Sequence, residues 1–162
     1  MKFYENLDEV MKHLTDKGAF LTVKAADGAV NTMTISWGFI GYMWYKPQFI
    51  VVVRPQRHTK TLLDSAVDFT VSVPFGVLVD ELKICGTKSG RDINKAEAVN
   101  FISAKMTDSP IVDGCAAYYE CKINYKDRFD KAFLPKEIIE KVYNAADYHE
   151  VFMGEIVESY IK

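Results

Sequence analysis

Apolar residues recur along this chain with two periods, and the positions at which the period changes mark the expected elements. Between residues 5 and 14 they have the i, i+3, i+4, i+7 spacing of one helix face: Leu7, Val10, Met11 and Leu14. From Ala19 the period becomes two, which is typical of a half-buried strand, and Asp27-Gly28 then gives a hairpin turn signal before the strand that follows Asn31. A short leading helix followed by a β-hairpin is therefore predicted.

The same two periods predict the remaining elements. Strands are expected at 49–53, 67–73, 115–125 and 149–160. Helices are expected at 58–66, at 78–85 with an end at Gly86, and from a start at Pro135 to 146. Many strands with few, separated helices do not form the alternating rhythm of a parallel sheet. We therefore predict a mainly β (α+β) fold, an antiparallel barrel with peripheral helices, as a single domain over 1–162.

The strand at 115–125 is expected to be buried on one face only. That face carries Cys115, Ala117, Tyr119, Cys121, Ile123 and Tyr125. The opposite, solvent-facing side is expected to carry Glu120, Lys122 and Asn124. The chain has three cysteines, an odd number, with neither a CxxC pair nor a metal-ligand spacing. We expect reduced thiols that act as small buried hydrophobes, and no metal site.

Charge and hydropathy narrow the possible partners. The net charge is −2 and no long Lys/Arg stripe is present, which argues against binding a nucleic acid backbone. No apolar run approaches the roughly 18 residues of a membrane span, which argues against a membrane partner. The amino-terminal segment lacks the apolar core of a signal peptide, so a cytoplasmic location is expected.

Candidate binding residues concentrate between Asn31 and Thr61. Three hydroxyl residues alternate with three large apolar ones, so that a strand would separate them onto two faces: Thr32, Thr34 and Ser36 against Met33, Ile35 and Trp37. Farther along, basic and hydroxyl residues surround an expected helix start: Arg54, Arg57, His58, Thr59 and Thr61. The residues alone leave two alternatives open, a site for a planar ring and a phosphate, or a hairpin followed by a solvated basic turn.

Five segments carry a resemblance to a known family. In chain order they are NTMTISW at 31–37, VVRPQRHTKT at 52–61, DFTVSVP at 68–74, CGTKSGRDINK at 85–95 and YHEVFMGEIV at 148–157. Together they span most of the chain, which resembles the flavin reductase-like, FMN-binding split barrels and, within them, the flavoredoxin branch. The resemblance implies an antiparallel split β-barrel. GxGxxG, Walker, GxSxG and HExxH motifs are absent.

The resemblance also implies where FMN would bind. The first segment would contact the isoalloxazine edge through Asn31, Thr32, Met33, Thr34, Ser36 and Trp37. The second would lie near the ribityl phosphate through Arg54, Arg57, His58 and Thr59. Lys95, with Ser89 and Gly90, would approach the phosphate or the ring edge. Two alternatives stay open: Trp37 as an ordinary core or interface aromatic, and 88–95 as a solvated loop.

His149 matches the histidine that the family carries near the flavin, where it would influence hydride transfer or ring polarity. A surface histidine at a helix–strand junction is the competing interpretation. The segment from Asp127 to Asp147 is an insertion relative to many flavin reductases, and flavoredoxin-like members share such a helix. Its role is left open.

Three functions are compatible with this pattern. The first is an FMN-dependent oxidoreductase that moves electrons from NAD(P)H or a protein donor to a small acceptor or a partner. The second is a non-enzymatic FMN electron carrier, and the third is a flavin-free barrel that binds another anion. No acid–base pair or nucleophile stands out, which fits chemistry carried by a cofactor.

A homodimer is expected from a surplus of apolar residues that one small barrel does not bury. They follow one another with little polar relief: Trp37, Phe39, Ile40, Tyr42, Met43, Trp44 and Tyr45. The family resemblance implies the same pairing, with the flavin at the seam between two subunits.

Overall fold

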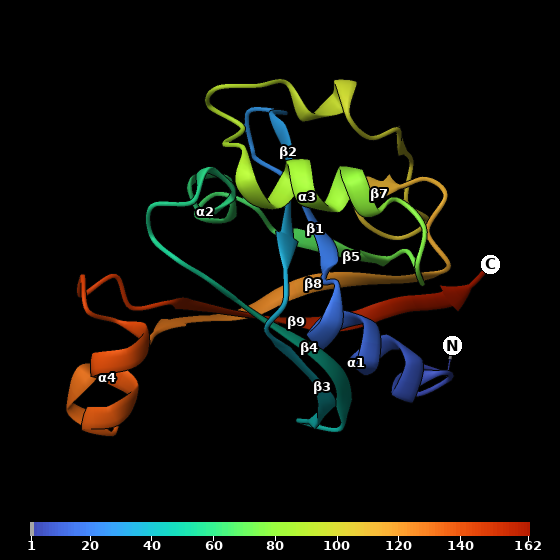
Figure 1. The fold of residues 1–162 in the computed structure, drawn as a ribbon. Helices are drawn as coiled ribbons and strands as arrows, with labels where there is room; N and C mark the ends of the chain where they lie inside the picture. Colours follow the sequence, from blue (N-terminus) through green and yellow to red (C-terminus); the bar gives the residue numbers. More distant parts are fainter. Residues whose placement is uncertain (1) are drawn as a thin grey trace.

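Nine strands and four α-helices make up the part of the chain that the computed structural model describes, residues 2–162 (Figure 1). Met1, the first residue of the predicted single domain, lies outside it. Seven strands form one sheet in the order β2-β1-β5-β8-β9-β4-β3. They are β1 (Ala19–Lys24), β2 (Val30–Ile35), β3 (Gly38–Met43), β4 (Lys46–Val53), β5 (Asp68–Val73), β8 (Ala117–Arg128) and β9 (Glu150–Ile161). All six neighbouring pairs are antiparallel.

The helices and two short strands lie around this sheet. The helices are α1 (Leu7–Asp16), α2 (His58–Leu63), α3 (Val79–Thr87) and α4 (Lys136–Val142), with 3-10 turns η1 (Lys95–Glu97) and η2 (Lys131–Phe133). The short strands β6 (Phe101–Ile102) and β7 (Ile111–Val112) pair with each other. The predicted antiparallel sheet with peripheral helices is therefore confirmed.

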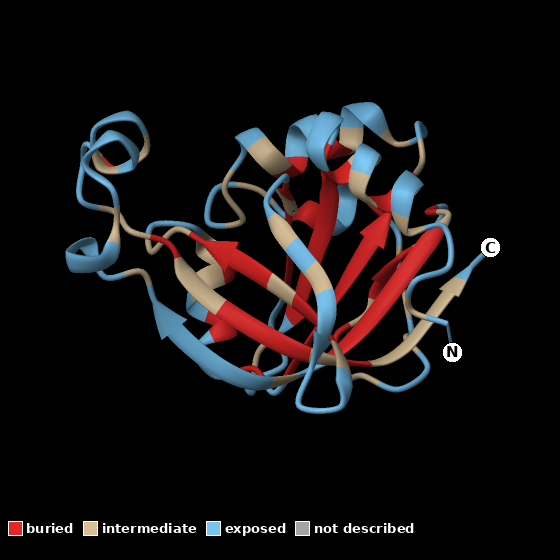
Figure 2. Ribbon diagram, turned by 90° about the horizontal axis from the view of Figure 1, so that it is seen from below, coloured by how far each residue is buried: buried red, intermediate tan, exposed pale blue. Residues whose placement is uncertain are grey.

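Two hydrophobic cores hold the fold together. In the larger one the sheet curls over its own side chains, so that Phe49 on β4, Phe69 on β5 and Phe152 on β9 pack together with residues of α1 and α2. The smaller core lies between Phe20 and Tyr118 of the sheet and Leu82 of α3. Both faces of the central strands are therefore covered, which Figure 2 shows as buried segments running through the sheet.

The prediction that Glu120 faces solvent is wrong. Its side chain is fully buried, and its carboxylate accepts hydrogen bonds from the backbone N–H groups of Lys105 and Met106 and from the Tyr160 hydroxyl. The loop at 103–110 covers this face of β8. The carboxylate of Glu120 therefore needs hydrogen-bond donors from the protein in place of water. Cys85, Cys115 and Cys121 are buried free thiols, as predicted.

Several element boundaries also differ from the predictions. Helix α3 continues through Gly86 to Thr87, because the missing Cβ lets the helix pack against Thr34, whose Cβ would lie 3.3 Å from an added methyl group. Strand β2 ends at Ile35, so Ser36 and Trp37 lie beyond it and are exposed. The helix after Pro135 ends at Val142, before the expected 146.

Helix α4 stands apart from the rest of the fold, near the end of the long ribbon formed by β8 and β9 (Figure 1). None of its residues is buried, so its apolar face lacks the cover that the amphipathic pattern predicts. The chain is fixed at the following residue instead, since Tyr143 is buried. Over residues 2–162, no helix is long and apolar enough to cross a membrane.

Candidate functional site

Two adjoining hollows lie along β2. The first, here called the aromatic hollow, has a volume of about 240 Å³ and is lined by Met33, Thr34, Ile35, Ser36, Trp37, Val52, Arg54, Arg57 and His149. The second, the cationic hollow, has about 190 Å³ and is lined by Asn31, Met33, Gln56, Arg57, His58, Thr59, Cys85, Thr87, Lys88, Ser89, Gly90, Asp92 and Lys95. Met33 and Arg57 line both, so the two hollows adjoin each other. Every site residue implied by the family resemblance except Thr32 lines one of them, whereas Thr61 of the basic turn lines neither.

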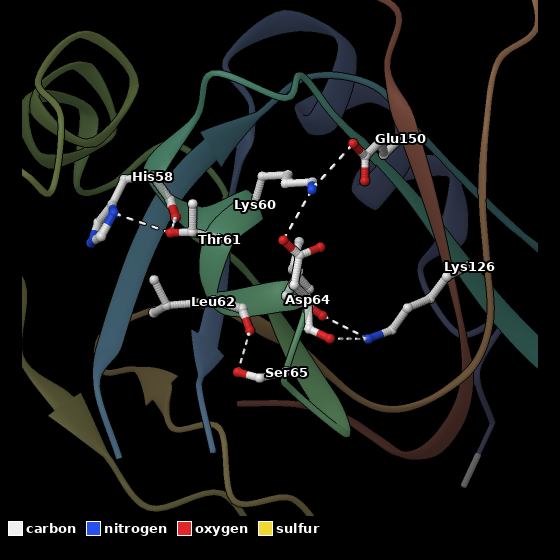
Figure 3. Close-up of polar contacts among 9 residues, drawn as sticks. His58, Lys60, Thr61, Leu62, Asp64, Ser65, Lys126 and Glu150 are labelled. Carbon is white, nitrogen blue, oxygen red and sulfur yellow. Dashed lines mark hydrogen bonds and ion pairs between the residues drawn. The ribbon is translucent and has the colours of Figure 1, made fainter. Parts of the chain in front are cut away.

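Helix α2 presents His58 and Thr59 to the cationic hollow, and contacts from other elements fix it there (Figure 3). The Lys126 ammonium donates to the carbonyl oxygens of Leu63 (2.7 Å), Asp64 (3.1 Å) and Ala66 (3.3 Å) at the carboxyl end of the helix. A cation is favourable there because the helix dipole is negative at that end. Lys60 forms ion pairs with Asp64 at 3.0 Å and with Glu150 of β9 at 3.3 Å. A six-residue helix is thus held at both its side and its end.

Close packing shapes the wall of the cationic hollow. The side-chain amide of Asn31 donates to the Thr59 hydroxyl over 2.8 Å, which joins β2 to α2. Gly90 approaches this pair so closely that an added Cβ would lie 2.7 Å from Cδ2 of His58 and 2.8 Å from Cγ of Asn31. Real Cβ atoms do not come this close to other heavy atoms. Any side chain at this position would therefore force Asn31 or His58 to shift.

Lys95 lies beneath the cationic hollow, in η1, and is only 5% exposed. Its ammonium donates to the carbonyl oxygens of Thr32 and Cys85, each at 2.8 Å, and so ties β2 to α3. One of its three N–H bonds is left for a ligand. Burial lowers the pKa of Lys95, and the nearby charge of Arg57 adds to this effect. No pattern in the sequence indicates that this loop lysine is buried.

Thr32 is the predicted residue that reaches neither hollow. Its side chain is fully buried, where its hydroxyl donates to the Leu21 carbonyl and accepts from the Thr22 hydroxyl. Its carbonyl oxygen still supports the site, through Lys95. The alternation correctly places Thr32 and Met33 on opposite faces of β2. Both faces of this strand are covered, so the Thr32 hydroxyl points into the protein and not toward a ligand.

The aromatic hollow is built around Trp37 and His149. Their ring centroids lie 5.0 Å apart at an interplanar angle of 44°. Trp37 is 50% exposed, whereas His149 is buried and forms a hydrogen bond of 2.8 Å between its Nδ1 and the Tyr143 hydroxyl. Burial, aided by the charge of Arg54, lowers the pKa of His149 to about 4. The imidazole is therefore neutral near pH 7, and it is not the surface histidine of the competing interpretation.

Arg54 lies in the aromatic hollow and not in the cationic one. Its guanidinium forms an ion pair with Asp147, donates to the Val142 carbonyl over 3.0 Å, and lies 5.4 Å from the centre of the Tyr143 ring. Gln56 donates to the same Asp147 carboxylate over 2.8 Å. Arg54 thus fastens the carboxyl end of the 127–147 segment to the site.

Sequence reasoning missed Tyr143 and Asp147 as parts of the site. Tyr143 fitted the apolar face of a predicted helix, and Asp147 lay in a polar connection. The one feature of the sequence that points to a role for them in the site is that each lies within six residues of His149. Across the described residues, no three His, Cys, Asp or Glu side chains are grouped so that they would hold a metal ion.

The stability of the fold is expected to depend on the protonation of His149. Its pKa is about 4 in the folded protein against an ordinary value of 6.5, so between these values the unfolded chain binds the extra proton. The free energy of unfolding should therefore rise as the pH increases across this window. The total increase is about 1.4 kcal/mol for each unit by which the two pKa values differ. Urea denaturation of the wild type and of His149→Gln at several pH values measures this. The same pH slope in both proteins would contradict the assignment.

Comparison with known proteins places this geometry in context. A sequence model described as the flavin reductase like domain matches residues 11–162. An uncharacterized protein from Archaeoglobus fulgidus is 29% identical over 96 residues, which cover 57% of this chain and 53% of that protein. The alignment therefore includes only about half the length of that curated relative.

Two solved structures superpose well. The flavoredoxin from Methanosarcina acetivorans gives a TM-score of 0.72 at 19% identity, over 90% of this chain and 68% of that chain. An FMN-binding protein from Thermus thermophilus with bound 1-cyclohex-2-enone gives 0.69 at 26% identity, over 89% of this chain and 69% of that chain. The split-barrel fold expected from the sequence is thereby confirmed.

Proposed function

Because the chain belongs to the flavin reductase like domain family, we propose that it binds FMN and acts as an FMN-dependent oxidoreductase. The observation that carries the proposal is the junction of the two hollows. A cationic hollow with hydroxyl donors adjoins, at Met33 and Arg57, a hollow with an aromatic wall. A ligand in which a phosphate is joined to a planar ring matches these two hollows, since its phosphate suits the cationic one and its ring suits the aromatic wall.

The residues of the cationic hollow fit a phosphate. Thr59, Ser89, Arg57 and Lys95 supply hydroxyl, guanidinium and ammonium donors, and Asp92 is the one carboxylate that lines the hollow. Gly90 packs directly against the side chains of Asn31 and His58 in the wall of this hollow. Arg57 has no ion-pair partner among the described residues, so its charge is available to a ligand. Charge-assisted hydrogen bonds to phosphate are about twice as strong as neutral ones.

The aromatic hollow fits the ring. Met33 and Val52 offer apolar surface, and Trp37 offers an aromatic face. The neutral His149, held by Tyr143, adds a polar edge without adding charge. Bound FMN would supply the two-electron chemistry that the side chains of this site lack. In this proposal Arg54, paired with Asp147, holds the wall of the hollow, which is a different role from the phosphate contact expected from the sequence.

The first test is the preference of the protein for FMN over riboflavin. We expect FMN to bind at least about tenfold more tightly, because each charge-assisted hydrogen bond to the phosphate contributes about 1.5–3 kcal/mol. Calorimetric titration of the flavin-free protein measures both affinities. Arg57→Ala should reduce the ratio, whereas Arg128→Ala, at the exposed end of β8, should leave it unchanged. Equal affinities of the wild type for the two flavins would refute the proposed phosphate site.

The electron donor and acceptor form the second part of the proposal. We propose NAD(P)H or a reduced redox protein as donor, and a small unsaturated carbonyl compound as acceptor. The acceptor class is supported by the 1-cyclohex-2-enone bound to the Thermus thermophilus protein. The alternative is an electron carrier with no small-molecule substrate. Anaerobic bleaching of the yellow protein by NADH or NADPH would favour the enzyme, and reduction only by redox proteins would favour the carrier.

We also propose that two copies pair along β3, an edge strand of the sheet. Its outer surface and turn expose Phe39 (63%), Tyr42 (64%), Trp44 (54%) and Tyr45 (92%). Trp44 and Tyr45 form the turn to β4 with φ of 55° and 61°, a left-handed conformation that such turns usually give to Asn or Gly. Exposed aromatic residues in this strained turn support the proposal that the turn contacts the surface of a second copy.

If the second copy also covers the exposed face of Trp37, FMN should stabilise the dimer by linkage. Sedimentation of flavin-free and FMN-loaded protein over a dilution series should then show a lower dissociation constant of the subunits in the presence of FMN. A monomer that binds FMN stoichiometrically at low micromolar concentration would rule the pairing out.

A further inference from the structure

A third hollow opens beside the aromatic hollow, on the side of α1 and α3. This outer hollow has a volume of about 440 Å³ and shares Thr34, Ser36 and Arg57 with the aromatic hollow. The two therefore adjoin each other. A ligand that approaches the aromatic hollow from this side would leave part of its structure in the outer hollow, so the groups that line the outer hollow affect which ligands fit.

The charges of the outer hollow are predominantly positive. Lys17, Lys83 and Arg57 line it together with a single carboxylate, Asp16. Asp16 lies 3.7 Å from the Lys17 ammonium, and both side chains are more than half exposed, so this pair is weak. Within residues 2–162, neither Lys83 nor Arg57 lies in an ion pair. The hollow thus carries an excess of two positive charges in a chain whose net charge is −2.

Apolar groups lie beside these cations. Val79 and Leu82 of α3 line the hollow, and Val79 is 49% exposed. The Thr34 hydroxyl is already committed to the Leu82 carbonyl at 2.6 Å, whereas Ser36 lies exposed at the boundary with the aromatic hollow. Cations next to apolar surface match an organic anion, with an apolar body and a charged end, better than inorganic phosphate.

We propose that the outer hollow binds the carboxylate of a small planar substrate whose unsaturated part points toward the flavin ring proposed for the aromatic hollow. This inference rests on the proposed function, because the ligand is a substrate only if the protein is an oxidoreductase. It narrows the substrates of that function to anionic compounds. Lys17 and Lys83 are the residues that select the charge, since they line neither of the other two hollows. Arg57 lines all three and lies where the substrate and the cofactor would meet.

The test compares two ligands of nearly equal shape, cinnamate and cinnamamide, which differ in charge. Calorimetric titration of the FMN-loaded protein at low ionic strength should show cinnamate bound about fivefold or more tightly. The ratio should fall toward one at about 0.5 M salt, because the lysines are exposed. Lys17→Ala and Lys83→Ala should each lower the ratio, and Lys83→Glu should lower it most. Lys131→Ala is the matched control, since Lys131 is exposed and lines none of the hollows.

Two further measurements separate this inference from the proposed function. FMN affinity is measured in every variant and should stay unchanged in Lys17→Ala and Lys83→Ala. The cinnamate and cinnamamide titrations are repeated with flavin-free protein, because protein groups alone form the outer hollow. Equal affinities for the two ligands with FMN bound, or an unchanged ratio in both lysine variants, would overturn the inference. Cinnamate preference in a protein that never binds FMN would overturn the proposed function alone.

Discussion

Replacing Gly90 by alanine is expected to weaken FMN binding by about 10- to 100-fold, because the added methyl group has no space. It would lie 2.7 Å from Cδ2 of His58 and 2.8 Å from Cγ of Asn31, and both side chains form the wall of the cationic hollow. Overpacking of this kind costs about 1–3 kcal/mol, and the shift needed to relieve it would displace the groups proposed to hold the phosphate. Calorimetric titration with FMN measures the loss.

Gly28→Ala provides the control for this substitution. Gly28 lies in the turn between β1 and β2 with φ of 89°, and no atom lies within 4 Å of the position that a Cβ would occupy. The variant should lose some stability through backbone strain but bind FMN like the wild type. If Gly90→Ala also binds FMN with unchanged affinity, the phosphate does not occupy the cationic hollow.

Lys95→Met is expected to cost about 2–4 kcal/mol of stability and to weaken FMN binding. The substitution keeps most of the side-chain volume but removes the donor that serves the carbonyl oxygens of Thr32 and Cys85. Buried polar groups left without partners account for about 1–3 kcal/mol each. This revises the expectation from the sequence, in which a loop lysine would contribute to binding alone. Urea denaturation and flavin titration measure the two effects.

Lys88→Met is the matched comparison, because Lys88 also lines the cationic hollow but is exposed. Its replacement should leave the free energy of unfolding within about 0.5 kcal/mol of the wild type. Equal stability of Lys95→Met and Lys88→Met would show that the buried contacts of Lys95 do not support the fold.

The site was predictable from sequence to the extent that its residues lie in short continuous segments. Residues 31–37 and 54–59 were proposed together, and the structure brings them to the same pair of hollows because β2 and α2 are joined by Asn31 and Thr59. Lys95 and Gly90 were placed near them by resemblance alone. No spacing rule relates a loop at 85–95 to a strand at 31–37, since their contact depends on how α3 packs on β2.

The period of the apolar residues determined the helices and the strands other than β3, β6 and β7, because each period places side chains on one face whatever the element packs against. The tertiary structure decided which polar residues are buried and which charges are paired. Glu120 and Lys95 follow polar patterns locally, and they are buried because loops and helices distant in sequence cover them. Arg54 meets Asp147 across 93 positions, a contact that arises only when β4 pairs with β9. Such contacts depend on strand order and register, so they form only when the whole sheet has formed.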